Sequence, residues 1–421
     1  MESTKLVKII ALSTVTTVML HATNGDNLIA VGTKARGMGG VGIAMSHGAE
    51  SALSNPALIT GVENTEISFG GTIFMPTIDT TITGFSPMIP PSGGNFTDPK
   101  FTSDADRNLI PSVSIAHKFD ENWYIGVGMW GTAGLGVDFS NATGGGFNNF
   151  NMVTNLQLLQ FGVTAAYKTG GLSVAATPII QYGNIDINYV LPAGFNGATS
   201  ATNVGAGLAQ DFGFGYNIGI TYDFSEDGIT GLTLGAIYKS SIKMDYKHQL
   251  TTALGPFQAP GENLLPDGDT LEQPAEMGVG ISYEMGQHTI AFDYKKIKWS
   301  DAKGYKAFGW EDSDVYAIGY QYTQDNWVLR AGYNRADSAV VEGQDPRLNF
   351  FNLVGFPATQ EQHYTLGGSY AFSDMFSVDL AYVYAPKNTE TFDVSAAFGP
   401  GSNVSNAHSE DSVSIQLTYK F

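Results

Sequence analysis

Two things are scarce in this 421-residue chain: cysteine is absent, and positive charge is outnumbered. Without cysteine there is no disulfide scaffold, no thiolate metal site and no cysteine nucleophile. Lysine and arginine number 21 against 40 aspartates and glutamates, and the net charge of −19 argues against nucleic acid as a partner. Beyond residue 22 no stretch approaches the ~20 consecutive apolar residues that a membrane-spanning helix requires. No transmembrane helix is therefore expected.

The sequence also contains no recognisable arrangement of catalytic residues. The seven histidines are scattered, and none lies at the spacing of a metal-binding pair. We therefore expect no enzymatic activity, no metal and no cofactor. One alternative stays open, because distant strands can bring a serine and a histidine together: a lipase with His117 or His288 as its base.

What the chain does contain is apolar and polar residues in regular alternation. In residues 412–421 every second side chain is apolar, which is typical of a strand with one apolar and one polar face. The apolar positions are Val413, Ile415, Leu417, Tyr419 and Phe421. Similar alternation recurs about fourteen times, in a chain with 51 glycines and 12% aromatic residues, a composition that suits strands and loops better than helices.

The predicted strands are joined by short and long connections in turn. We place the strands at residues 64–75, 111–119, 122–132, 154–168, 171–187, 211–224, 231–247, 274–285, 287–298, 312–322, 326–335, 361–372, 376–385 and 411–421. Six short turns alternate with seven long connections, at about 76–110, 133–153, 188–210, 248–273, 299–311, 336–360 and 386–410. Outer-membrane barrels have even strand numbers, short periplasmic turns and long external loops. The sequence therefore predicts a 14-stranded antiparallel β-barrel, all-β and multi-pass, in the outer membrane of a Gram-negative bacterium. A soluble β-sandwich or propeller would not require this alternation.

The N-terminal residues do not fit the strand pattern. A basic start and an apolar run that ends at Ala22 predict a signal peptide at residues 1–22, with a membrane-anchor helix as the alternative. Residues 23–62 are rich in small residues and carry apolar side chains that need burial. We expect them to form a small helical plug in the lumen of a barrel that spans residues 63–421, with a flexible periplasmic tail as the alternative.

Several short segments occur in an order that is informative as a set. They are Asn55-Pro56-Ala57-Leu58-Ile59-Thr60, Asp211-Phe212-Gly213-Phe214-Gly215-Tyr216-Asn217, Pro274-Ala275-Glu276-Met277, Lys298-Trp299-Ser300, Asp325-Asn326-Trp327 through Arg330-Ala331-Gly332, Tyr370-Ala371-Phe372 and Ser377-Val378-Asp379. Together they resemble the outer-membrane long-chain fatty acid transporter family, which also contains aromatic hydrocarbon uptake proteins. The resemblance implies passive uptake of hydrophobic molecules, with long-chain fatty acids as the expected substrate and monoaromatic hydrocarbons as the alternative. A general porin and a surface adhesin are alternatives of another class.

The resemblance also implies a gate and a binding residue. In the family account the plug moves when ligand binds, and a kinked third strand opens sideways toward the bilayer. Gly131, Gly134 and Gly136 are the expected gate in the third strand, because glycine weakens regular strand pairing. Lys306 matches a lysine position that the family uses near a bound carboxylate, and the run Asn55, Pro56 and Ala57 is assigned to the plug.

Further candidate ligand contacts are apolar residues in loops that should be wet. They need burial against a ligand or against each other, and they include Phe308, Trp310, Phe350 and Phe351. Arg330 lies on the polar face of its strand, so it should point into the lumen, where it can meet a ligand carboxylate or pair with one of the wall. The expected partners are a hydrophobic small molecule, outer-membrane lipid, lipopolysaccharide, and the barrel assembly machinery through the strand that ends at Phe421.

Overall fold

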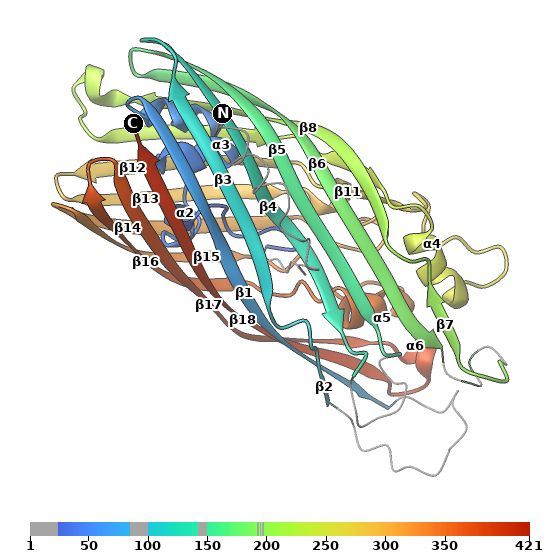
Figure 1. The fold of residues 1–421 in the computed structure, drawn as a ribbon. Coiled ribbons are helices and arrows are strands. Elements are labelled where there is room, and N and C mark those ends of the chain that lie inside the picture. The colour runs from blue at the N-terminus through green and yellow to red at the C-terminus, as the bar shows by residue number, and fades with distance from the viewer. Residues whose placement is uncertain (1–23, 85–99, 142–149, 192, 194, 196–197) are drawn as a thin grey trace, which may run out of the picture.

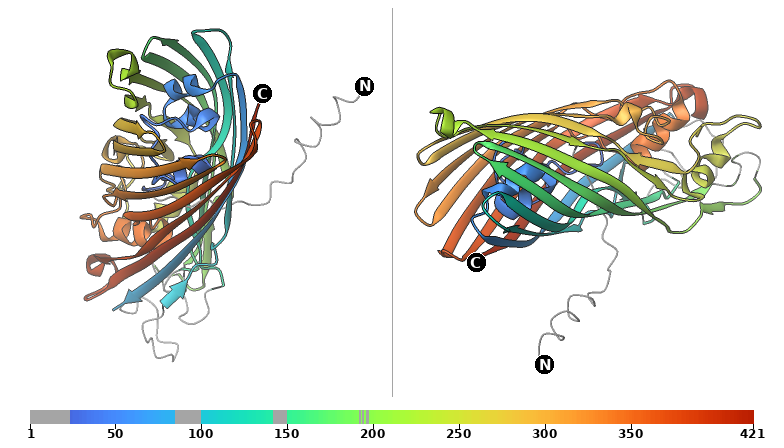
Figure 2. Two further views of the ribbon diagram at one scale, coloured as in Figure 1. Left: turned by 90° about the vertical axis from the view of Figure 1, so that its left-hand side faces the viewer. Right: turned by 90° about the horizontal axis from the view of Figure 1, so that it is seen from above.

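The computed structural model describes residues 24–84, 100–141, 150–191, 193, 195 and 198–421, so the expected signal peptide at 1–22 lies outside the described residues. Within them the strands form one antiparallel sheet that closes on itself, because β1 (Thr65–Thr83) pairs with β18 (Asn403–Lys420) over 18 residue pairs. Figures 1 and 2 show the resulting barrel from three directions. Closure leaves no unpaired sheet edge to face lipid.

Fourteen strands surround the lumen in the described part of the chain, in sequence order, which confirms the predicted barrel. Besides β1 and β18 they are β3 (Asn108–Lys118), β4 (Trp123–Asp138), β5 (Val153–Thr169), β6 (Leu172–Leu191), β8 (Ala209–Asp223), β9 (Leu232–Lys239), β12 (Glu276–Met285), β13 (His288–Ile297), β14 (Ser313–Gln324), β15 (Trp327–Ala336), β16 (Gln362–Ser373) and β17 (Phe376–Asp393). Short strands β2 (Lys100–Thr102) and β7 (Thr202–Gly205) extend the sheet at β1 and β6, and β10 (Ile242–Asp245) pairs separately with β11 (Thr270–Gln273).

The alternation in the sequence becomes an outer and an inner face. On β8 the side chains of Phe212, Phe214 and Ile220 are 59%, 73% and 45% exposed, whereas Asn217 and Thr221, which occupy alternate positions, are buried. The second half of β18 repeats the pattern, with Val413, Ile415 and Leu417 exposed and Ser412, Ser414, Gln416 and Thr418 buried. An apolar outer surface with a polar interior is what a barrel surrounded by lipid requires.

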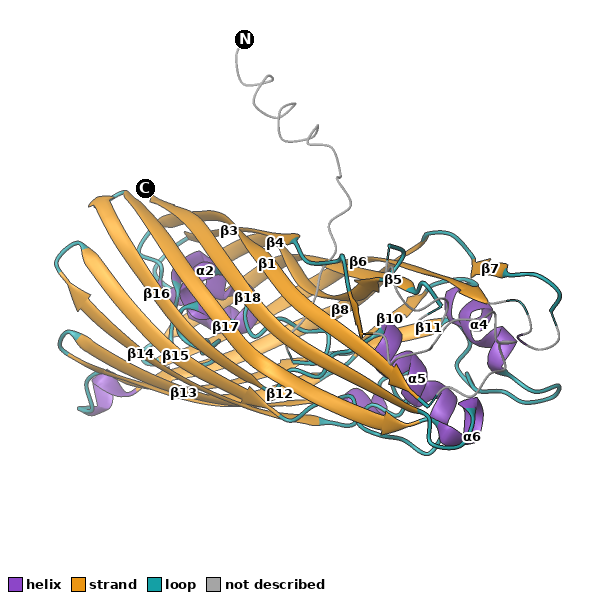
Figure 3. Ribbon diagram, turned by 90° about the horizontal axis from the view of Figure 1, so that it is seen from below, coloured by secondary structure: helices purple, strands orange, loops and turns teal. Residues whose placement is uncertain are grey.

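Helices form where the chain leaves the barrel wall. The N-terminal segment forms α2 (Thr33–Arg36), η1 (Gly48–Glu50), α3 (Ser51–Ser54) and η2 (Pro56–Gly61). The long connections contain α4 (Gln249–Leu254), η5 (Gly255–Phe257), η6 (Trp299–Asp301), α5 (Pro346–Gly355) and α6 (Ser395–Phe398), and a short turn contains η4 (Phe224–Asp227). Figure 3 shows α4, α5 and α6 gathered at one end of the barrel, away from α2. Among the described residues no helix combines the length and apolar character needed to cross a membrane.

Strands extend more than four residues beyond their predicted ends at β4, which runs to Asp138 instead of residue 132, and at three further strands. β1 runs to Thr83, β17 runs to Asp393, and β18 begins at Asn403, so the predicted long connections at 76–110 and 386–410 are partly strand. These extensions are rich in threonine, serine and asparagine and lack the apolar alternation. The predicted strand at 231–247 is also interrupted: β9 ends at Lys239, and β10 leaves the wall to pair with β11.

The N-terminal segment lies inside the barrel, where Figures 1 and 3 show α2 enclosed by the strands. Its apolar side chains Met38, Val41 and Ile59 are fully buried. Close packing depends on glycine in the wall, since a Cβ on Gly332 of β15 would lie 2.2 Å from the backbone at Met38. We call residues 24–32 the arm and residues 33–61 the hatch, because the two parts make different contacts.

Candidate functional site

The hatch is held in the lumen by buried carboxylates. Asp293 of β13 accepts hydrogen bonds from the backbone N–H groups of Gly42, at 2.7 Å, and Ile43, at 2.9 Å. Glu50 of the hatch accepts from the backbone of the same segment and from Gln416 of β18, whose side-chain amide lies 2.6 Å from the carboxylate. Burial raises the pKa of Glu50 to about 7. These bonds fix the hatch to two separate parts of the wall.

The run Asn55, Pro56 and Ala57 seats the hatch on the wall. The Asn55 side-chain oxygen accepts from the backbone N–H of Ala57 at 3.1 Å, and Pro56 occupies the first position of η2, so the run caps a short helix. The Asn55 amide donates to the Ile43 carbonyl at 2.6 Å. A Cβ on Gly219 of β8 would lie 1.9 Å from the Asn55 side-chain oxygen, so Asn55 fits against the wall only because residue 219 has no side chain.

The arm lies against an irregular point of β4, the third strand of the barrel. The pairing of β4 with β5 shifts between Gly131 and Ala133, which marks a β-bulge. The backbone N–H of Leu28 donates to the Thr132 carbonyl at 3.2 Å, and that of Gly134 donates to the Asp26 carbonyl at 3.0 Å. The arm thus bonds to both sides of the bulge. Gly131 and Gly134, two of the expected gate residues, flank this contact, and Gly136 follows it in β4.

Side chains from the long connections hold the arm in this position. The Tyr305 hydroxyl donates a hydrogen bond to Asp26, and the Gln273 amide donates to Asp26 at 2.9 Å and to Asn27 at 2.8 Å. Asn27 in turn donates to Glu276 at 3.3 Å. Asp26 is fully buried, and burial is the main cause that raises the pKa of its carboxyl to about 6.

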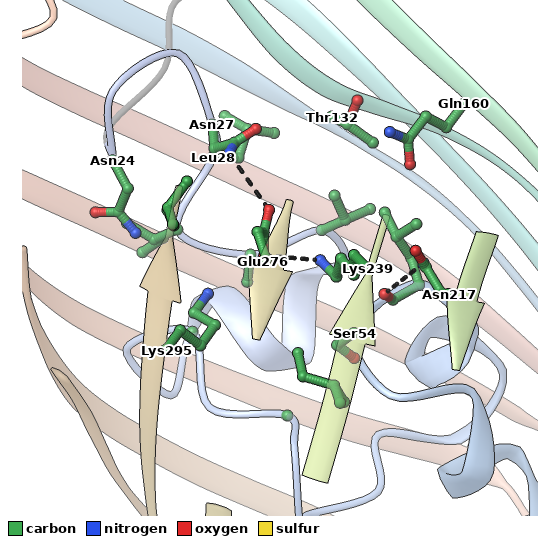
Figure 4. A pocket seen from close by; sticks show the side chains of 18 of the residues that line it. Asn24, Asn27, Leu28, Ser54, Thr132, Gln160, Asn217, Lys239, Glu276 and Lys295 are labelled. Atoms are coloured by element: carbon green, nitrogen blue, oxygen red, sulfur yellow. Dashed lines mark hydrogen bonds and ion pairs between the residues drawn. The ribbon is translucent and has the colours of Figure 1, made fainter. Parts of the chain in front are cut away.

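A cavity of about 70 Å³ lies in the lumen between the arm and the hatch, and we call it the polar cavity because charged side chains line it. Figure 4 shows Thr132 and Gln160 on one side of it, with Lys239 and Glu276 facing each other on the other. Lys239 and Glu276 form an ion pair at 3.2 Å. Asp293 and Lys295 also line the cavity, so two positive and two negative side chains lie in its wall, which is formed by the arm, the hatch and the strands.

A smaller apolar cavity of about 20 Å³ lies on the side of the arm that faces the long connections. Its lining residues are Leu135, Leu156, Leu250, Leu271, Tyr305, Phe308, Trp310, Asn352 and Phe356. Two of the expected ligand contacts, Phe308 and Trp310, are among them, and no charged side chain is. Its polar members are bonded within the protein: Asn352 accepts from Trp310 at 3.1 Å and donates to the Phe308 carbonyl at 2.8 Å.

Phe350 and Phe351 belong to an aromatic cluster above this cavity. The Phe350 ring lies 5.3 Å from that of Phe150 and 4.8 Å from that of Phe398, and the Phe351 ring lies 5.0 Å from that of Phe257. The cluster joins four of the long connections. It satisfies the burial that these loop residues need, so the structure brings Phe350 and Phe351 near the apolar cavity without placing them in its lining.

The two expected cationic contacts lie elsewhere. Lys306 is exposed, although its neighbour Tyr305 lines the apolar cavity. Arg330 points into the lumen, as expected, and donates to Gln321 at 2.7 Å and to Ser369 at 2.5 Å, with Asp379 at 4.0 Å. The pairing with a wall carboxylate is therefore present for Arg330, which lies in the wall beside the hatch and away from the apolar cavity.

Two histidines that seemed scattered in the sequence meet in the barrel. His363 of β16 and His408 of β18 lie 3.4 Å and 3.3 Å from the carboxylate of Glu410, and all three side chains are buried. In the described part of the chain no group of three histidines or carboxylates is placed to hold a metal ion. The cluster is a structural contact between wall strands that no local spacing revealed.

Arg347 at the start of α5 ties two long connections together. Its guanidinium donates to Glu262 through two bonds of 2.6 Å, to Asp345 at 2.6 Å and to the Phe257 carbonyl at 2.9 Å. The guanidinium lowers the pKa of the Glu262 carboxyl to about 2. We call this group the Arg347 clasp. Sequence alone gave no sign of it, because residues 262 and 347 are far apart in the chain.

Breaking the Arg347 clasp should loosen the connection at 258–269. We expect Arg347→Met to speed cleavage of this connection severalfold when intact cells are treated with protease, whereas the exposed Arg107→Met should not. The pKa of Glu262 is lowered in the folded protein, so the clasp contributes fully above pH ~4.5 and is lost as pH falls toward 2. Equal cleavage rates for the wild type and Arg347→Met would contradict this role.

Taken together, these features define an outer-membrane β-barrel transporter whose lumen holds its own N-terminal segment. The model of the family described as outer membrane protein transport protein (OMPP1/FadL/TodX) matches residues 15–421, so the chain belongs to this family. This confirms the resemblance read from the sequence and the outer-membrane location. Members of the family are transport proteins.

Curated relatives and solved structures agree with this assignment. The chain is 26% identical over 385 residues to the long-chain fatty acid transport protein of Escherichia coli O6:H1, covering 81% of this chain and 82% of the relative. It is 24% identical over 384 residues to the 47 kDa outer membrane protein of Pasteurella multocida, with 83% and 84% covered. The toluene transporter TodX of P. putida has the same fold, with a TM-score of 0.68, 18% identity, and 93% and 99% covered. A Pseudomonas aeruginosa FadL homologue also has this fold, with a TM-score of 0.70 and 16% identity, and the match covers 96% of this chain and 99% of the homologue.

Proposed function

We propose that this chain carries uncharged hydrophobic molecules from the external loops to an opening in the barrel wall at β4. One residue carries the proposal: Tyr305 lines the apolar cavity and also bonds Asp26 of the arm. Because the arm bonds to the bulge of β4, a ligand that displaces Tyr305 acts on the arm and on the wall behind it. Transport of this kind needs no chemical step and no energy source.

Exit through the wall is favoured over exit through the lumen. Buried polar bonds and close backbone packing anchor the hatch around its circumference, from Asp293 on β13 to Gln416 on β18. The arm, by contrast, is bonded directly to the bulge of β4 and is held from the other side by Tyr305 and Gln273, so a change at these side chains reaches β4 through the arm. A hydrophobic molecule also gains by entering the bilayer directly instead of an aqueous lumen. Gly131, Gly134 and Gly136 accordingly remain the proposed gate.

The lining of the apolar cavity favours an uncharged ligand. A carboxylate buried there would meet no cation among the described lining residues, and burying an unpaired charge is costly. At about 20 Å³ the cavity is also too small for a ligand, so aromatic side chains must move to admit one. Long-chain fatty acids are the second candidate. They are favoured by the position of Lys306, beside Tyr305 at the cavity, and by the likeness to fatty acid transport proteins.

A fatty acid and its methyl ester separate the two candidates, because they share a tail and differ in charge. We expect cells to take up the ester at least as fast as the acid, and Lys306→Ala to change either rate by no more than a few-fold, since the side chain is exposed. If the acid is preferred and Lys306→Ala removes that preference, the carboxylate is recognised and fatty acids replace the uncharged substrates.

The apolar cavity itself is tested by filling it. Leu250→Trp adds bulk to the lining and should slow uptake of both probes severalfold, whereas the same change at the exposed Leu208 should not. Surface levels of the variants are matched by immunoblot. Unchanged uptake in Leu250→Trp would place the binding site elsewhere.

A further inference from the structure

Asp26 is a buried carboxylate whose direct partners are neutral. It is fully buried, and its side-chain hydrogen bonds come from the Tyr305 hydroxyl and the Gln273 amide. No ion pair within the described part of the chain involves Asp26. A charge held by two neutral donors in a buried site is less stable than the same charge in water. Docking the arm therefore carries an electrostatic cost whenever Asp26 is ionised.

The charged groups around Asp26 do not offset this cost. Glu276 of β12 adds a second negative charge nearby, and it is Glu276 that pairs with Lys239 at 3.2 Å. Lys295 of β13 also lies close to Glu276, on the far side of the polar cavity from Gln160 (Figure 4). Tyr246, in the connection after β10, faces Asp26 with a neutral hydroxyl. On β4 the contact is to backbone alone.

We propose that Asp26 is a proton-linked latch: the docked arm holds a proton that the released arm gives up, so acidification strengthens docking of the arm on β4. The proton comes from water and returns to it. The claim that the latch regulates the gate rests on the proposed function. The claim that docking of the arm depends on pH does not. Neutral pH then favours a releasable arm, and acid keeps the wall closed.

The direction follows from the site. The pKa of Asp26 is about 6 in the docked arm and near the ordinary 3.8 in a solvated one. A raised carboxyl pKa means that the docked state binds more protons, so docking gains strength as pH falls through 6 and loses it as pH rises. With these two pKa values, the equilibrium constant for docking of the arm is roughly tenfold larger at pH 5 than at pH 8.

The test measures arm docking directly, without ligand. Because the chain lacks cysteine, Ala30→Cys gives one site for a small trifluoromethyl tag in the arm. Fluorine NMR of the full chain in lipid nanodiscs then reports docked and released populations from pH 5 to pH 8. The same series in a Leu28→Ala background, which removes packing against Phe74 and Ile110, brings the released population into range.

Two isosteric variants decide the assignment. Asp26→Asn should keep the arm docked at the level of pH 5 and remove the pH dependence, whereas Glu50→Gln, which alters a buried carboxylate of the hatch, should retain it. A flat wild-type series in both backgrounds would overturn the latch, as would a dependence that survives in Asp26→Asn or disappears in Glu50→Gln. Heat-modified mobility on gels verifies folding. A pH-dependent arm in a protein that takes up neither probe would refute the proposed function and leave the latch standing.

Discussion

Deleting Thr132 should lower uptake of hydrophobic probes to the level of cells without the channel, while the barrel stays folded in the outer membrane. Thr132 is the extra residue of the β4 bulge, because Gly131 pairs with Leu159 and Ala133 pairs with Leu158. Its removal brings the two strands into continuous register. A regular, fully paired wall offers no place at which a ligand can leave sideways.

The deletion also preserves the facing of the side chains. Trp130 and Leu135 both face the interior, where Trp130 bonds Ser114 and Leu135 lines the apolar cavity, although residues five apart lie on opposite faces of a regular strand. Removing Thr132 makes them four apart and restores the period. Gly131→Val is a poorer test, since a Cβ there would lie 2.7 Å from the Ile110 side chain and disturb β3.

A second bulge supplies the matched control. The pairing of β17 with β18 shifts between Ala385 and Asn388, and among the described residues β17 forms no hydrogen bond with the arm. Deleting Lys387 removes one residue from that bulge and should leave uptake near the wild-type rate. Wild-type uptake in the Thr132 deletion, with a regular β4 shown by structure determination, would rule out the lateral route.

The barrel could be predicted from the sequence because its cause is local. Lipid outside and polar lumen inside impose period two on every spanning strand, as in Phe212, Phe214 and Ile220 of β8, and a single sequence displays that period directly. The ends of β1, β17 and β18 were not predicted for the same reason: the parts that extend beyond the predicted strands lack the apolar alternation, and their sequence is typical of loops.

The site was harder to predict because its contacts are not local. Tyr305 and Asp26 are 279 residues apart, and no spacing in the sequence announces their bond. Glycine density in the third strand indicated a bend, but it could not identify Thr132 as the extra residue. Phe308 and Trp310 were found because apolar loop residues need burial, whereas the side chain of Lys306, chosen by family likeness, is exposed.

Deleting residues 24–60 should leave a folded barrel and raise its single-channel conductance in planar bilayers by on the order of tenfold or more, because a barrel of this size encloses water once its lumen is cleared. The strand ladder closes through β1 and β18 without the N-terminal segment. The inward side chains that hold the hatch, such as Asp293 and Gln416, are polar and become hydrated when it is removed.

A shorter deletion separates the two parts of the segment. Removing residues 24–32 takes away the arm and leaves the hatch, whose bonds to Asp293 and Gln416 do not depend on the arm. Conductance should then stay close to that of the wild type, because the hatch still fills the lumen. If the long deletion left conductance unchanged, the segment would not be what closes the lumen. If the short deletion raised it as much as the long one, the arm alone would close the channel, and the hatch would be only a support for it.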